Sequence, residues 1–172
     1  MTIKTSAYER SKLWPPKSIP KSFPKNFKRS EWDCYDKRGQ LIPKGALIAA
    51  VPATGPVYQA VLLCAWNCQR IRDRLCDIYQ RDVKMTVLSG WRPKIYNDAI
   101  KGASNSQHLY GRAADLTAFG VPTKSLYEVA LKMARSGEID QGGIGYYPRS
   151  RFVHVDTRCV YGMKAARWSQ KA

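Results

Sequence analysis

The chain contains two histidines, His108 and His154, and each is followed closely in the sequence by an aspartate, Asp115 or Asp156. Neutral imidazole and carboxylate groups are common zinc ligands, and a catalytic zinc usually has three protein ligands and a water molecule. We interpret His108, Asp115 and His154 as three ligands of one zinc ion. Gly111 would let the backbone bend so that the first two side chains meet. Taken alone, these residues leave open the alternative that each His and Asp only pair or cap locally.

The second histidine lies in an alternating segment, Phe152–Asp156, that is typical of a strand. Residues two apart on a strand face the same side, about 7 Å from each other. His154 and Asp156 are therefore expected to face the site, while Val153 and Val155 pack behind it. Two roles are open for Asp156: it takes a proton from the attacking water, or it orients His154 as a hydrogen-bond acceptor.

Five stretches extend this pattern and together resemble the zinc D-Ala-D-Ala carboxypeptidase and murein endopeptidase family. Vancomycin-resistance dipeptidases and the hedgehog signalling domain share the fold of that family. The resemblance covers about residues 27–160 and implies a zinc peptidase that cleaves peptidoglycan. The stretches are SGWRP at 89–93, YN at 96–97, GASNSQHLYGRAADL at 102–116, GGIGYYP at 142–148 and FVHVDTR at 152–158.

The resemblance also implies substrate-binding residues. Arg92 corresponds to an arginine that binds the substrate carboxylate or steadies the oxyanion, for which a guanidinium is well shaped; the alternative is a surface salt bridge. Ser106 resembles a substrate-contacting serine, although capping or orienting a ligand is equally open to it. Tyr146 and Tyr147 are expected to line the cleft, where one of them donates to the oxyanion; aromatic packing is the alternative for each.

The identity of the general base stays open. Relatives often carry a glutamate three residues before the final histidine, and here that position is Arg151. Asp156 is our replacement candidate. Glu138 and Asp140, in the loop before the GGIG segment, are weaker candidates.

The periodicity of apolar residues predicts the elements that position these groups. The fold class is expected to be α+β: a small antiparallel sheet with flanking helices in one domain like that of hedgehog and the DD-peptidases. Apolar residues three and four apart predict two amphipathic helices, and alternating residues predict strands. The helices are expected at 56–80 and 122–135, and the strands at 83–89, 112–119, 142–147 and 152–156, the last two antiparallel.

Both ends of the chain are basic, which suggests three segments: an arm at 1–30, a zinc peptidase domain at 31–160 and a C-terminal tail at 161–172. The arm has eight Lys/Arg against one Glu and repeats PKSI-PKSF-PKNF, so its prolines favour an extended conformation. It is either a solvated basic tail or a docking arm. In the second case Ile19, Phe23 and Phe27 would fill pockets on this domain or on a partner.

Composition limits the class of protein. The 172 residues suit one domain with a core of its own. Five cysteines without a C-x-x-C pair indicate buried, reduced thiols. No apolar run is long enough for a transmembrane helix, and the N-terminus lacks the apolar stretch of a signal peptide. We expect synthesis in the cytoplasm and action on the cell wall after release or as part of a virion.

The net charge of +16 favours polyanionic partners. Both nucleic acid and the anionic bacterial envelope fit that charge, but no nucleic-acid-binding motif is present. The favoured hypothesis is a zinc peptidase of peptidoglycan stem peptides or cross-links: a phage endolysin, or a virion- or tail-associated hydrolase whose arm contacts tail or other virion proteins. The alternatives are an inactive peptidoglycan-binding or virion structural module of the same fold and, ranked last, a nucleic-acid-binding protein. The bond that is cut is not specified.

Overall fold

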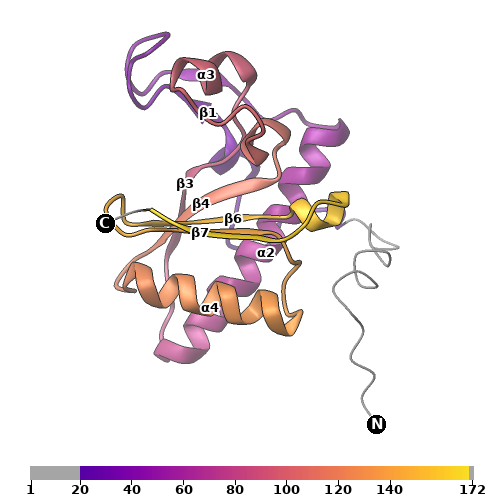
Figure 1. Ribbon diagram of the computed structural model, residues 1–172, viewed down its shortest axis with the longest axis vertical. Helices are drawn as coiled ribbons and strands as arrows, with labels where there is room; N and C mark the ends of the chain where they lie inside the picture. The colour runs from indigo at the N-terminus through magenta and orange to yellow at the C-terminus, as the bar shows by residue number, and fades with distance from the viewer. Residues whose placement is uncertain (1–19, 171–172) are drawn as a thin grey trace.

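A five-stranded sheet forms the centre of the computed structural model, which describes residues 20–170 (Figure 1). Its strand order is β3-β4-β6-β5-β7. Neighbouring strands are antiparallel except for β5 and β7, which are parallel. The strands are β3 (Met85–Ser89), β4 (Ala113–Ala118), β5 (Gly143–Tyr147), β6 (Phe152–Asp156) and β7 (Ala166–Ser169).

Two long helices, α2 (Gly55–Tyr79) and α4 (Thr123–Ser136), bury their apolar stripes against one side of the sheet. The core combines these stripes with inward-facing strand residues such as Val153 and Val155. Gly137, in the left-handed conformation with φ of 78°, ends α4. Both predicted helices and the antiparallel pair of strands are confirmed, and so is the α+β fold class. Within residues 20–170, no helix is long and apolar enough to cross a membrane.

A small lobe lies on the other side of the sheet from α4 (Figure 1). It contains the two-stranded pair β1 (Cys34–Tyr35) and β2 (Leu47–Ala49) together with the short helix α3 (Lys94–Ala99). The backbone N–H of Lys37 donates to the hydroxyl of Tyr96 at 3.1 Å, which ties the β1–β2 loop to α3. This lobe forms the upper wall of the functional cleft described below.

Three single 3₁₀ turns connect the larger elements: η1 (Arg29–Trp32), η2 (Gln107–Tyr110) and η3 (Arg158–Tyr161). The five cysteines are free thiols; of the three on α2, Cys64 and Cys68 are fully buried in the core and Cys76 is partly buried. Core packing therefore accounts for Cys64 and Cys68.

The described part of the N-terminal arm is packed on the domain. Phe27 is 2% exposed, and its ring lies 5.8 Å from that of Trp32; the ring of Phe23 lies 6.0 Å from that of Tyr58. The indole N–H of Trp66 on α2 donates to the carbonyl of Ser22 at 3.0 Å. Phe23 and Phe27 thus dock on this domain rather than extend into solvent. Ile19 and the rest of residues 1–19 lie outside the described residues.

The C-terminal segment differs from the expected tail, because residues 166–169 form β7 at the edge of the sheet. Its Trp168 packs over Gly145 of β5, where an added Cβ would lie 2.4 Å from the indole ring. A glycine at this position is needed for that close approach. The antiparallel pair of β5 and β6 is therefore not at the edge of the sheet, because β7 lies beyond β5.

Candidate metal centre

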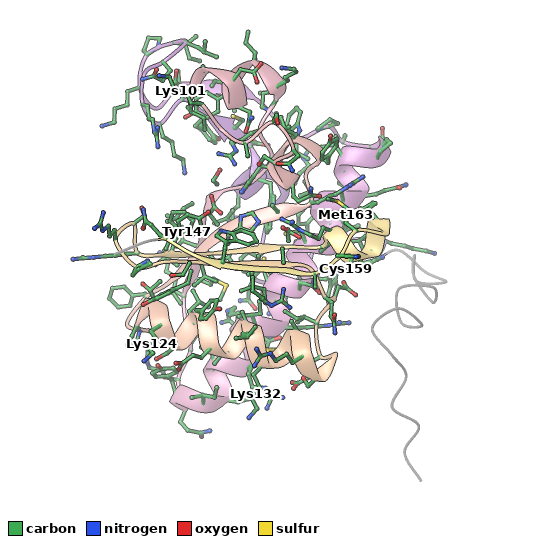
Figure 2. The ribbon with its side chains drawn as sticks, in the orientation of Figure 1. Lys101, Lys124, Lys132, Tyr147, Cys159 and Met163 are labelled. Carbon is green, nitrogen blue, oxygen red and sulfur yellow. The ribbon has the colours of Figure 1, made fainter. Side chains whose placement is uncertain are left out.

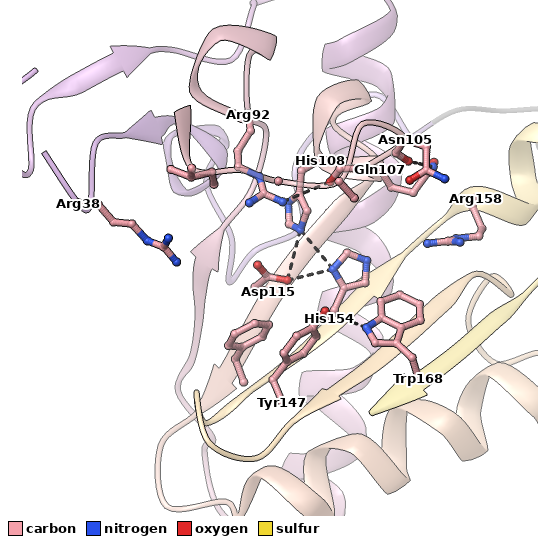
Figure 3. Close-up of a pocket in the computed structure, with 15 residues that line it drawn as sticks. Arg38, Arg92, Asn105, Gln107, His108, Asp115, Tyr147, His154, Arg158 and Trp168 are labelled. Carbon is pink, nitrogen blue, oxygen red and sulfur yellow. Dashed lines mark hydrogen bonds and ion pairs between the residues drawn. The ribbon is translucent and has the colours of Figure 1, made fainter. Parts of the chain in front are cut away.

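The side chains of His108 and Asp115 meet that of the distant His154 on the lobe side of the sheet (Figure 3). Nδ1 of His154 lies 3.2 Å from Nε2 of His108 and 3.0 Å from Oδ1 of Asp115. The same Oδ1 lies 3.3 Å from Nε2 of His108. Ligands of a tetrahedral zinc at bond lengths of about 2.0–2.1 Å are about 3.3 Å apart. The three donor atoms therefore have the spacing that a zinc ion requires.

Strand register and a glycine turn produce this arrangement. Asp115 on β4 is the direct cross-strand neighbour of His154 on β6, so both side chains project from the same face. His108 comes from η2, which ends at Gly111 with φ of 72°. A Cβ at Gly111 would lie 3.0 Å from a backbone oxygen of α2, so a larger residue could not make this turn without displacing the helix.

The outer nitrogen of each histidine is held by an acceptor. Nδ1 of His108 donates to the carbonyl of Gly90 at 2.6 Å, and Nε2 of His154 donates to Oδ2 of Asp156 at 3.0 Å. These bonds select the tautomers in which the inner nitrogens carry lone pairs toward the centre. Such second contacts are usual around metal-bound histidines, because they fix the orientation of the ring.

Asp156 is fixed behind the ring of His154 and does not line the cleft. Its carboxylate also accepts from the backbone N–H of Gly143 at 2.7 Å and from the guanidinium of Arg158 at 2.7 Å. Its side chain is fully buried. Of its two expected roles, this geometry supports orientation of His154, and it leaves Asp156 badly placed to act as the general base.

The charges at the centre favour a bound cation. Burial opposes ionisation of Asp115, but the imidazoles of His108 and His154 outweigh it and hold the pKa of that carboxyl well below its usual range. Burial lowers the pKa of His108. Burial also opposes the charging of His154, yet its bonds to Asp115 and Asp156 raise its pKa to about 9. The two carboxylates around His154 thus favour a positive charge at the centre, which a proton on the imidazole supplies and which a bound divalent cation would supply in its place.

A cleft of about 520 Å³ opens in front of these groups, between the lobe and the sheet. Arg92 and Ser106 line it, as expected, and the guanidinium of Arg92 donates to Oγ of Ser106 at 3.3 Å. Nε of Arg92 is buried and has no hydrogen-bond partner among the described residues. Tyr147 also lines the cleft.

Tyr146 was expected to line the cleft as well, and the structure places it elsewhere. Its ring lies 5.2 Å from that of Tyr127 on α4, so it packs between the sheet and that helix. Tyr147 projects from the side of the sheet away from α4 (Figure 2). Neighbouring residues on a strand face opposite sides, so only one of the two tyrosines can reach the centre.

The sequence analysis did not assign a role at the site to four further cleft residues, Trp168, Phe152, Arg38 and Arg158. The indole of Trp168 lies 5.1 Å from the ring of His154, and its N–H donates to the hydroxyl of Tyr147 at 2.8 Å. Phe152 stacks on Tyr147 at 4.3 Å. The alternation of Phe152 with His154 was a usable signal, whereas nothing local marked Trp168.

Neither loop candidate for the general base reaches the cleft. Glu138 pairs with Arg74, and the backbone N–H of Asp140 donates to Asn67. Arg151, where relatives often have a glutamate, is exposed in the turn between β5 and β6. Among the described residues that line the cleft, Asp115 is the only carboxylate.

Comparison with known proteins agrees with this geometry. The chain is 36% identical to the probable peptidoglycan L,D-endopeptidase MepK of Haemophilus influenzae over 83 residues, which are 45% of this chain and 41% of that protein. It is 36% identical to the peptidoglycan L,D-endopeptidase MepK of Escherichia coli K12 over 76 residues, 41% of this chain and 38% of that protein. Identity to the zinc D-Ala-D-Ala carboxypeptidase of Streptomyces albus G is 32% over 94 residues, 55% of this chain and 34% of that protein.

The matched segments thus span less than half the length of each of these relatives. The family pattern covers much more of this chain: it matches residues 43–156, which include all three residues of the centre. The chain belongs to the Peptidase M15 family.

Proposed function

We propose that this chain is a zinc peptidase that hydrolyses peptide bonds of bacterial peptidoglycan. The observation that carries the proposal is the tetrahedral spacing of the donor atoms of His108, Asp115 and His154. Relatives whose names describe peptidoglycan endopeptidases and a zinc carboxypeptidase support the substrate and the metal.

In this proposal His108, Asp115 and His154 hold the zinc ion. When bound, zinc in such a site lowers the pKa of a water molecule and polarises a carbonyl group. Gly90 and Asp156 keep the two imidazoles oriented through their outer nitrogens. The guanidinium of Arg92, whose Nε has no partner among the described residues, is available to bind a substrate carboxylate.

Tyr147 is the proposed hydrogen-bond donor to the oxygen of the attacked carbonyl. Its hydroxyl oxygen accepts from Trp168, which leaves the hydroxyl hydrogen directed elsewhere. Stacking on Phe152 fixes the ring. Asp115 is the only carboxylate among the described cleft residues, so the cleft offers no second carboxylate to serve as the general base.

That missing carboxylate is also what favours a second candidate function: a peptidoglycan-binding module without turnover. The two candidates predict different outcomes when the protein is incubated with purified peptidoglycan. The hydrolase releases new muropeptides, and the module only sediments with the wall.

We further propose that the protein acts on the cell wall after release from the cytoplasm, as a phage endolysin or as a component of a virion. The net charge of +16 supports this setting, because it favours the anionic envelope. The peptidase domain in this proposal continues through β7, beyond the expected boundary at residue 160. In this proposal the arm at 1–30 would contact tail or other virion proteins.

Digestion of purified peptidoglycan tests the proposal. The zinc-loaded protein should release muropeptides that mass spectrometry identifies, which also reports the bond cut. A chelator should stop the release and added zinc should restore it. His108→Ala should release none, while Arg135→Gln, an exposed change on α4, should behave as the unmodified protein. Binding to the sacculus with no release by the zinc-loaded protein would favour the binding module instead.

A further inference from the structure

The cleft continues past the metal centre beneath the lobe. A second hollow of about 430 Å³ lies beside the first, and both are bordered by Arg38, Arg92, Asp115 and Phe152. Lys37 and Tyr96 belong to the wall of the second hollow. A peptide bound across the centre would therefore lie partly against the sheet and partly against the β1–β2 loop.

Arginines stand at both ends of this cleft (Figure 3). Arg158, at one end, is bound to Asp156, and Arg92, near the middle, donates to Ser106. Arg38, at the other end, makes no side-chain hydrogen bond or ion pair with any residue in the range 20–170, although it borders both hollows. Arg38 is exposed at the border of the cleft, and its guanidinium has no ion-pair partner among the described residues.

The carboxylates near this end are already engaged. Asp33 borders the second hollow, and its Oδ1 accepts from the backbone N–H of Val51 at 2.7 Å. Asp36 is fully buried and turns inward to the backbone of its own loop. Asp115 belongs to the metal centre. None of these carboxylates pairs with the exposed guanidinium of Arg38, which is therefore free to meet an anionic group of a ligand.

The loop that carries Arg38 is rigidly held. The carboxylate of Asp36 accepts from the backbone N–H groups of Arg38, Leu41 and Ile42 at 3.1, 2.7 and 3.1 Å. The backbone of Lys37 is bonded to Tyr96 on the facing helix. Because this backbone is held before any ligand binds, a contact with Arg38 would require the ordering of its side chain but not of the loop.

We propose that Arg38, assisted by Lys37, binds a carboxylate of the substrate on the lobe side of the metal centre. It would thereby select peptides in which that carboxylate is free over those in which it is an amide. A guanidinium forms paired hydrogen bonds with a carboxylate that it cannot form with an amide. This inference rests on the proposed function, since it names a chemical requirement of the substrate at the same site.

The test uses a set of peptides that resemble the peptidoglycan stem. In each peptide of the set, a different one of the free carboxylates is converted to an amide. For the unmodified protein and Arg38→Gln, kcat/KM is measured on every peptide of the set. We expect Arg38→Gln to lose at least about tenfold, mainly through KM, on all peptides except the one that lacks the relevant carboxylate. Arg38→Lys should recover part of the loss, and Arg135→Gln should lose nothing. An equal loss on every peptide, or no loss, would overturn the inference.

Failure of the proposed function gives a different result. In that case the zinc-loaded unmodified protein cleaves none of the peptides and no peptidoglycan. Calorimetric binding of the same peptides then decides the inference alone. Weaker binding by Arg38→Gln to all but one peptide supports it, and equal binding by both proteins to every peptide overturns it.

Discussion

Nε2 of His108 and Nδ1 of His154 lie 3.2 Å apart, although 46 positions separate the two residues in the chain. Each imidazole donates its outer N–H to an oxygen of the protein, so each inner nitrogen points to the centre, where it can coordinate a cation in place of a proton. The carboxylate of Asp115 lies beside both inner nitrogens and favours positive charge at this point, from a proton or from a bound cation. The following predictions depend on that relationship and on the elements that maintain it.

Zinc should stabilise the fold. A ligand that binds only the folded state adds about 2.7 kcal/mol to the free energy of unfolding when its concentration is 100 times its Kd. Chelated protein should therefore melt at a lower temperature than zinc-loaded protein in differential scanning fluorimetry. Asp115→Ala should abolish the difference, and Asp98→Ala, on the exposed face of α3, should keep it. A melting temperature that does not respond to zinc would contradict the assignment.

Asp156 should act on the metal through His154. Asp156→Asn keeps an acceptor of similar size but removes the charge behind the imidazole. We expect zinc affinity to fall about 10- to 100-fold without being abolished, as is usual for residues that orient metal-bound histidines. Competition with a chromophoric chelator measures the affinity, and Asp98→Asn is the matched control. Unchanged zinc affinity combined with lost turnover would instead indicate that Asp156 is the general base.

The docked N-terminal segment should contribute to stability. Phe27→Ala removes a side chain that is 2% exposed and should lower the free energy of unfolding by about 3 kcal/mol. Phe119→Ala removes the same group from a position that is 78% exposed, where we expect a change within about 0.5 kcal/mol. Urea denaturation measures both. Similar values for the two variants would show that residues 20–30 do not pack as described.

Gly145 should be required because Trp168 lies directly over it. Gly145→Ala places a methyl group 2.4 Å from the indole, so the ring must move away from His154 and Tyr147. We expect Gly145→Ala and Trp168→Ala each to lower activity on peptidoglycan, and the double variant to lose no more than the worse of the two. Fully additive losses would mean that the glycine acts independently of the indole.

The sequence predicted the features that depend on local periodicity and spacing. Both helices are confirmed because their apolar residues recur every three or four positions, and Gly111 turns as its type suggested. The structure brings His108, Asp115 and His154 together, and their role as zinc ligands is the proposal that the experiments test.

Features that depend on pairing between distant strands could not be predicted from local periodicity and spacing. Either Tyr146 or Tyr147 could face the centre until the register of β5 against β6 was known, and that register pairs Gly145 with His154. The segment 166–169 is short and contains one large apolar residue, Trp168, so its place in the sheet comes from contacts with β5. Arg38 reaches the cleft only because the lobe folds over the sheet.

The most direct test of the account is the zinc content of the purified chain measured by elemental mass spectrometry, alongside that of His108→Ala. Both proteins would be loaded with zinc and then passed through the same desalting step. The account predicts one zinc ion per chain for the unmodified protein and almost none for the variant. Equal zinc content in the two proteins, or no retained zinc in either, would contradict it.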